Sequence, residues 1–248
     1  MFRRAQHHEP HSGILQLGRI LLPLRVSTWG AYAMSYLGVP MVVGRPMVVV
    51  QDEDLEMATH KLGNSGFIPS SPNRNPAPEI MAELPDPQAV LRKINKGYER
   101  LDHSCKTFNC PSHLTGSFRQ VLLIPASFAR LPDFNLKTAQ YDVYGNIFYP
   151  HQRTLLESCI RAAIDEKNNT GFTTWASSIE AWISMMVGYL GLENDVLDDC
   201  LDEQVVTWYS TRFGRIHESK HGPFDRRVSK RLGSGKELSV DMSGRPLS

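Results

Sequence analysis

Residues 41–50 constrain the fold of this chain more than any other segment. They are almost all apolar and end in three consecutive valines, without the polar alternation that marks a strand with one face in water. That composition is typical of a central strand buried on both faces. Pro46 cannot donate a ladder hydrogen bond and Gly44 loosens the backbone, so we expect this strand to be bent or interrupted at Gly44-Arg45-Pro46.

Helix and strand patterns alternate on both sides of this run. Before it, an apolar helical stripe stopped by Pro23 precedes a short strand, and Gly30 stands where that strand would turn into the next helix. After it, an acidic opening followed by apolar residues at helical spacing predicts a helix whose dipole favours negative charge at its N-terminus. The expected elements are helices at residues 14–22, 31–37 and 52–62, strands at 24–29 and 41–50, and a strand beginning at 67–68.

The middle of the chain is less regular. Residues 69–87 hold six prolines, too many for a helix or a central strand, so we expect a loop or insertion there. Residues 88–119 show weak periodicity, with a short strand or two expected near 103–108. Residues 120–125 form a second apolar run, closed by a proline, that predicts a short buried strand.

Beyond Pro150 the pattern becomes helical. Three apolar stripes at helical spacing predict three helices that pack as a bundle against the α/β part. The Trp and Met side chains of the second stripe favour core packing, with an apolar ligand pocket as the alternative. The stripes cover residues 155–163, 175–190 and 196–208.

Composition limits the classes of function. The 248 residues carry a net charge of +1, which argues against a dedicated nucleic-acid binder, because neutralising phosphates requires a basic excess. Residues 211–248 alone hold nine Lys and Arg against four Asp and Glu, and we expect a solvated tail there, with nucleic acid or an acidic partner as the alternative.

The N-terminus lacks the apolar centre of a secretory signal, and no segment approaches the ~20 apolar residues of a membrane helix. We therefore expect no membrane partner, a location in the cytoplasm or nucleus, and reduced cysteines.

Trp29-Gly30-Ala31, followed by thirteen residues and then the strand that begins at Arg45, carries a family resemblance. The arrangement resembles the nucleotidyltransferase superfamily, specifically a group of uncharacterised fungal proteins of that kind, over roughly residues 14–68. The resemblance implies a mixed α/β (α+β) sheet with flanking helices, followed by a C-terminal helical segment. The expected plan is a flexible N-terminus (1–13), a nucleotidyltransferase-like domain (14–150) with the Pro-rich insertion 69–87, a helical region (151–212) and a basic flexible tail (213–248).

The resemblance also implies that the catalytic acids of this family are missing. Active members carry two metal-binding carboxylates at the positions of Arg45 and Met47, and a guanidinium or a thioether does not suit a hard cation that demands oxygen ligands. Ala31 replaces a residue that helps to seat a phosphate in the family, and residues 121–124, the expected strand for a third acid, contain none. We therefore expect degenerate active-site positions at Gly30, Ala31, Arg45 and Met47, no catalytic residue, no cofactor, and a binding or interaction role with an unknown protein or small molecule.

Two alternative interpretations stay open, one for the acids that follow the strand and one for Arg45. Asp52 and Glu53 are candidate replacement ligands, which would make the chain a divergent nucleotidyltransferase using Mg²⁺ and a nucleotide; helix capping is the simpler explanation of Asp52-Glu53-Asp54. Arg45 is either a loop arginine at a strand break or a direct partner of a phosphate or carboxylate ligand. A third possibility is that the helical C-terminal region is itself the surface that binds a partner.

A zinc site is the remaining metal hypothesis. His103, Cys105, Cys110 and His113 supply four zinc-type ligands within eleven residues, although the spacing differs from standard finger patterns. Scattered thiols and surface histidines explain the same residues without a metal. The sequence contains no G-x-S-x-G, P-loop or H-E-x-x-H motif, which leaves hydrolase, P-loop and zincin chemistry without support.

Overall fold

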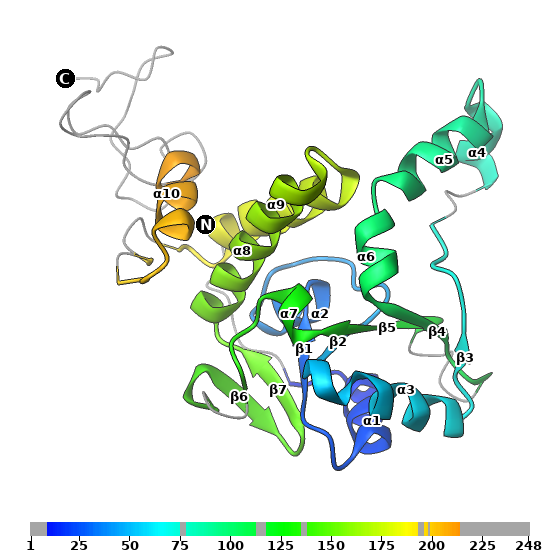
Figure 1. Ribbon diagram of the computed structural model, residues 1–248, viewed down its shortest axis with the longest axis horizontal. Coiled ribbons are helices and arrows are strands. Elements are labelled where there is room, and N and C mark those ends of the chain that lie inside the picture. The colour runs from blue at the N-terminus through cyan, green and yellow to red at the C-terminus, as the bar shows by residue number, and fades with distance from the viewer. Residues whose placement is uncertain are drawn as a thin grey trace.

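A seven-stranded mixed sheet forms the centre of the computed structural model (Figure 1). The structure describes residues 9–74, 78–112, 118–134, 138–192, 196–197 and 199–213. The fold is mixed α/β, with parallel and antiparallel strand pairs in one sheet, as the sequence predicts. The strand order is β3-β4-β5-β2-β1-β7-β6, with β1 Val26–Trp29, β2 Met47–Val50, β3 Ile68–Pro69, β4 Lys106–Asn109, β5 Gln120–Pro125, β6 Tyr141–Tyr144 and β7 Ile147–Pro150.

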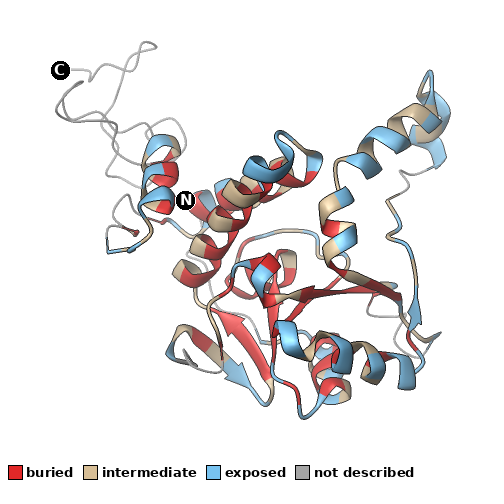
Figure 2. Cartoon of the chain, viewed as in Figure 1, coloured by how far each residue is buried: buried red, intermediate tan, exposed pale blue. Residues whose placement is uncertain are grey.

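Strands β1 and β2 occupy the middle of this sheet. They run antiparallel, with Trp29 opposite Met47, while β2 runs parallel to β5 and β1 runs parallel to β7. All four residues of β1 are buried, as are Val48, Val49 and Val50 of β2. Figure 2 shows this burial concentrated in the central strands and on the inward faces of the long helices. The valine run thus forms the doubly covered strand that its composition predicts.

The strand break at Gly44-Arg45-Pro46 is confirmed. Regular pairing covers only Met47–Val50, and residues 41–46 lie outside any strand. Pro46 has no N–H to donate, but its carbonyl accepts a hydrogen bond from Leu122 N at 2.9 Å, so it still anchors the start of β2 to β5.

Ten α-helices lie in the described part of the chain. The helices predicted at residues 14–22, 31–37 and 52–62 are present, but the predicted flexible segment 1–13 is too long. Helix α1 already begins at Ser12, because the His11 side chain accepts a hydrogen bond from Gly13 N at 3.1 Å; residues 1–8 lie outside the described residues. The helices are α1 Ser12–Leu21, α2 Ala31–Tyr36, α3 Leu55–Asn64, α4 Pro78–Glu83, α5 Pro87–Lys96, α6 Glu99–Ser104, α7 Ala126–Ala129, α8 Gln152–Thr170, α9 Thr174–Tyr189 and α10 Glu203–Arg212, with a 3-10 turn η1 Asp52–Asp54 before α3.

Residues 69–87, which we predicted to be a loop or insertion with too many prolines for a helix, include helical segments. Helices α4 and α5 begin at Pro78 and Pro87, because the first helical position needs no N–H donor and proline already has a helical φ there. Asp86 caps α5 by accepting a hydrogen bond from Ala89 N at 2.8 Å. Figure 1 shows α4, α5 and α6 as an arm that rises from the β3–β4 side of the sheet.

The C-terminal region is helical, with one correction. Helices α8 and α9 carry the first two apolar stripes, and Trp175, Ile179 and Met186 of the second stripe are buried, which confirms core packing. The third helix is shorter than its stripe, because Asp202 caps it and it begins only at Glu203. The hairpin of β6 and β7 was not predicted, and the tail from residue 214 lies outside the described residues. No described helix is both long and apolar enough to cross a bilayer.

Candidate functional site

The turn between β1 and α2 is packed against apolar side chains. Gly30 has φ 61° and ψ −136°, a conformation that favours glycine, and it places α2 directly after the buried Trp29. A Cβ atom added to Gly30 would lie 2.9 Å from Met47 Sδ and 2.9 Å from the Trp182 ring. The thioether of Met47 and the indole of Trp182 therefore occupy the space beside the turn.

Three tryptophans hold this arrangement in place. Trp29, Trp175 and Trp182 form a cluster with ring centroids 5.4 to 5.9 Å apart, so α9 packs its N-terminal half onto the end of β1. Trp29 Nε1 also donates a hydrogen bond to Ser158 Oγ of α8 at 2.8 Å. Trp182 is thus fixed over Gly30 by ring contacts that connect the helical region to the sheet.

Arg45 lies two residues before β2, next to a second guanidinium. It is half-buried, and burial followed by the positive charge of Arg74 lowers the pKa of Arg45 below its usual value. Arg74 donates two hydrogen bonds to the Asp102 carboxylate and stacks 4.2 Å from the Tyr98 ring centroid. Among the described residues Arg45 makes no ion pair of its own. Two guanidinium groups therefore lie near one carboxylate, which is hydrogen-bonded to Arg74.

The other candidate site positions add no acid. Ala31 is the first residue of α2 and offers no hydroxyl group. Strand β5 lies parallel to β2 with Leu122 opposite Met47, and its four central residues, 121–124, are buried and apolar. The neighbouring strand, like β2, thus presents no carboxylate to this site.

Asp52 and Glu53 lie at the opposite end of β2 from Gly30. Because β1 and β2 are antiparallel, the Gly30 turn adjoins Met47, and five residues of nearly extended chain place Asp52 roughly 16 Å further along. Asp52 and Glu53 instead line a separate pocket of about 420 Å³ beside Ser127. The two acids therefore lie too far from the Gly30 turn to act beside it, and their use as metal ligands stays a prediction.

The capping explanation of these acids also needs correction. Neither Gln51 before η1 nor Asp54 before α3 makes a side-chain capping bond. Asp52 Oδ1 accepts a hydrogen bond from Ser127 N at 2.9 Å, so the carboxylate satisfies a donor in the first turn of α7 rather than in its own helix.

The cysteines of the zinc hypothesis lie at opposite ends of strand β4. Cys105 precedes β4 and Cys110 follows it, so about five extended residues separate their backbones by roughly 16 Å, too far for two ligands of one ion. Burial raises the pKa of the Cys105 thiol. Burial also raises the pKa of the Cys110 thiol, to about 11. His103 lies in α6, and His113 is outside the described residues, within which no group of three or more His, Cys, Asp or Glu side chains is placed to hold a metal.

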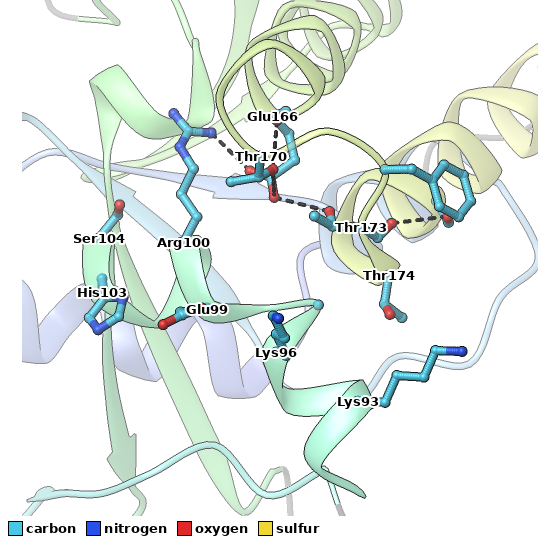
Figure 3. A pocket seen from close by; sticks show the side chains of 13 residues that line it. Lys93, Lys96, Glu99, Arg100, His103, Ser104, Glu166, Thr170, Thr173 and Thr174 are labelled. Carbon is cyan, nitrogen blue, oxygen red and sulfur yellow. Dashed lines mark hydrogen bonds and ion pairs between the residues drawn. The ribbon is translucent and has the colours of Figure 1, made fainter. Parts of the chain in front are cut away.

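A second pocket, of about 800 Å³, lies between the α5–α6 arm and the turn from α8 to α9 (Figure 3). Lys93, Lys96 and His103 line its arm side, and the buried carboxylate of Glu166 lies on its helical side. Sequence reasoning missed this pocket, because its walls come from segments about 70 residues apart. The only local signal was the pair of basic residues in the last turn of α5.

Comparison with known proteins adds no family assignment. The sequence matches no protein-family model, and no curated protein is significantly similar to it.

Proposed function

We propose that this protein is a nucleotidyltransferase-like binding module that does not carry out metal-dependent nucleotidyl transfer. The observation that carries the proposal is the contact of Met47 and Trp182 with the Gly30 turn, where the resemblance would place the metal ions and the nucleotide phosphates. The order α1, β1, glycine turn, α2, β2 agrees with that resemblance and supports it.

The chemistry of in-line phosphoryl transfer supports the loss of activity. Such transfer depends on charge stabilisation, which paired divalent cations held by carboxylates provide. Here a thioether and a guanidinium stand at the two ligand positions, and neither suits Mg²⁺. The Trp182 ring takes up part of the remaining space, so restoring the acids alone would not restore the cleft.

Arg45 gives the module a direct means of binding an anionic group. Its guanidinium offers five N–H donors in a planar fork that matches phosphate or carboxylate oxygens. Because the Asp102 carboxylate is hydrogen-bonded to both terminal nitrogens of the Arg74 guanidinium, the cluster of Arg45, Arg74 and Asp102 carries excess positive charge in a half-buried setting. A phosphate-bearing ligand would balance that charge without a metal.

The test combines an activity screen with a binding measurement. We expect no pyrophosphate release from the four nucleoside triphosphates with Mg²⁺ or Mn²⁺ across a broad panel of acceptors. We expect calorimetry to find ATP binding that is unchanged by EDTA and at least tenfold weaker in Arg45→Ala, while Arg92→Ala on exposed helix α5 leaves it unchanged. Pyrophosphate release, or ATP binding that requires Mg²⁺ and survives Arg45→Ala, would overturn the proposal.

A further inference from the structure

The pocket between the arm and the long helices has walls that the protein fixes itself. Trp175 N at the start of α9 donates a hydrogen bond to Gly97 O between α5 and α6 at 3.0 Å. The hydroxyls of Tyr98 and Ser178 lie 3.1 Å apart and form a second link. The approach at Gly97 is so close that a Cβ there would lie 2.3 Å from Thr174 Oγ1. These contacts hold the basic end of α5 opposite the first turn of α9.

The carboxylate deepest in the pocket is already neutralised. Glu166 is 1% exposed, and its Oε2 accepts a hydrogen bond from Arg100 at 2.9 Å. Its Oε1 accepts hydrogen bonds from Thr170 and Thr173, both at 3.0 Å, as the dashed lines of Figure 3 show. Arg100 also pairs with Asp165. Because Glu166 is paired and saturated, it does not repel an anion that enters the pocket.

The charged side chains of the pocket that are available to a ligand are mainly positive. Lys93 and Lys96 project from the last turn of α5 and, within the described residues, take part in no ion pair. Glu99 is the single lining acid outside the Glu166 cluster, so the two lysines leave an excess of positive charge. Lysines bind phosphate as point charges, and two on one wall suit a doubly charged group.

The pocket lining includes one exposed aromatic side chain. Phe172, in the turn between α8 and α9, lines the pocket and is 90% exposed. A phenylalanine ring this exposed gains free energy when an apolar or aromatic partner covers it. The pocket thus places a cationic wall and an aromatic face on the same ligand-sized space.

We propose that this pocket binds a small phosphorylated organic molecule, with its phosphate group at Lys93 and Lys96 and its ring or apolar part against Phe172. The volume of about 800 Å³ lies within the range of small-molecule sites and bounds the ligand to metabolite size. This site is distinct from the cluster of Arg45, Arg74 and Asp102. Asp102 of α6 faces Arg74, whereas Arg100 and His103 of the same helix line the pocket.

Phenyl phosphate is the simplest probe that combines both groups. We expect calorimetry on the full chain to show that phenyl phosphate binds more tightly than inorganic phosphate and more tightly than phenol. The double variant Lys93→Ala/Lys96→Ala should weaken phenyl phosphate binding at least tenfold, and Phe172→Ala should reduce it to the affinity of inorganic phosphate. The matched control is Arg92→Ala, which removes a cation of the same helix that does not line the pocket. All of these side chains are exposed, so the variants should unfold at the wild-type temperature.

Three results would overturn the proposal: no saturable binding of phenyl phosphate, equal binding by the double lysine variant, or equal weakening by Arg92→Ala. Tight binding of a polyuridylate strand that is lost in the double lysine variant, without binding of phenyl phosphate, would assign the lysines to RNA instead. Because Arg45→Ala leaves this pocket intact, it should not change phenyl phosphate binding here, and the two proposals can fail independently.

Discussion

Replacing Glu166 with alanine tests whether the buried ion cluster joins the arm to the helical region. The substitution removes the charge-assisted hydrogen bond from Arg100 and the two hydrogen bonds from Thr170 and Thr173. Removing one partner of a buried ion pair usually costs 3–5 kcal/mol, because the other charge loses its compensation. Arg100 is 25% exposed and keeps Asp165, so we expect the lower end of that range, about 3 kcal/mol.

A conservative variant separates charge from hydrogen bonding. Glu166→Gln keeps the size of the side chain and an acceptor for the threonines but loses the negative charge. We expect it to cost about 1.5 kcal/mol, the usual value of one hydrogen bond to a charged group. The matched control is Asp199→Ala, which removes a partner of Arg153 that is 78% exposed and should not change stability measurably.

Urea unfolding followed by tryptophan fluorescence measures these differences. With an unchanged slope, Glu166→Ala should lower the midpoint by roughly 1 M, because a chain of this size should have a urea slope near the upper end of the usual range, about 3 kcal/mol per M. A midpoint for Glu166→Ala equal to that of Asp199→Ala would refute the reasoning. It would mean that the cluster is no more than a surface ion pair and that the arm is held by other contacts.

Three further predictions follow from contacts elsewhere in the chain. Gly97→Ala should destabilise the protein by about 1–3 kcal/mol, because the added methyl group overlaps Thr174, and a midpoint unchanged in urea would show that the arm shifts freely. Ser158→Ala should cost about 1–3 kcal/mol by leaving the buried Trp29 indole N–H without an acceptor, and it should change tryptophan fluorescence; unaltered emission and stability would contradict this. Alkylation of Cys110 by iodoacetamide should rise most steeply near pH 11, because burial raises its pKa to about 11 and the thiolate is the reactive form; a rate that levels off by pH 9 would count against that burial.

The sequence by itself determined several local features of the N-terminal half of the chain. The valine run specified a doubly buried strand, Gly30 marked a turn that needs positive φ, and the prolines set the first positions of α4 and α5, although we interpreted those prolines as loop signals. The sequence alone also shows that Arg45 and Met47 carry no carboxylate. Each of these depends on the residue itself or on neighbours within one helical turn or one strand, so no distant contact was needed.

Tertiary structure decided what those residues do. The antiparallel register of β1 and β2 placed Met47 beside Gly30 and carried Asp52 to the far end of the strand, and no local pattern encodes that register. Trp182 reached the Gly30 turn from 152 positions away in the sequence, through packing of α9 on the tryptophan cluster. The pocket of Lys93, Lys96 and Phe172 likewise exists only because the Gly97 and Trp175 backbones meet. Periodicity reports which face of an element is buried, but the partner of that face depends on packing between segments far apart in the chain.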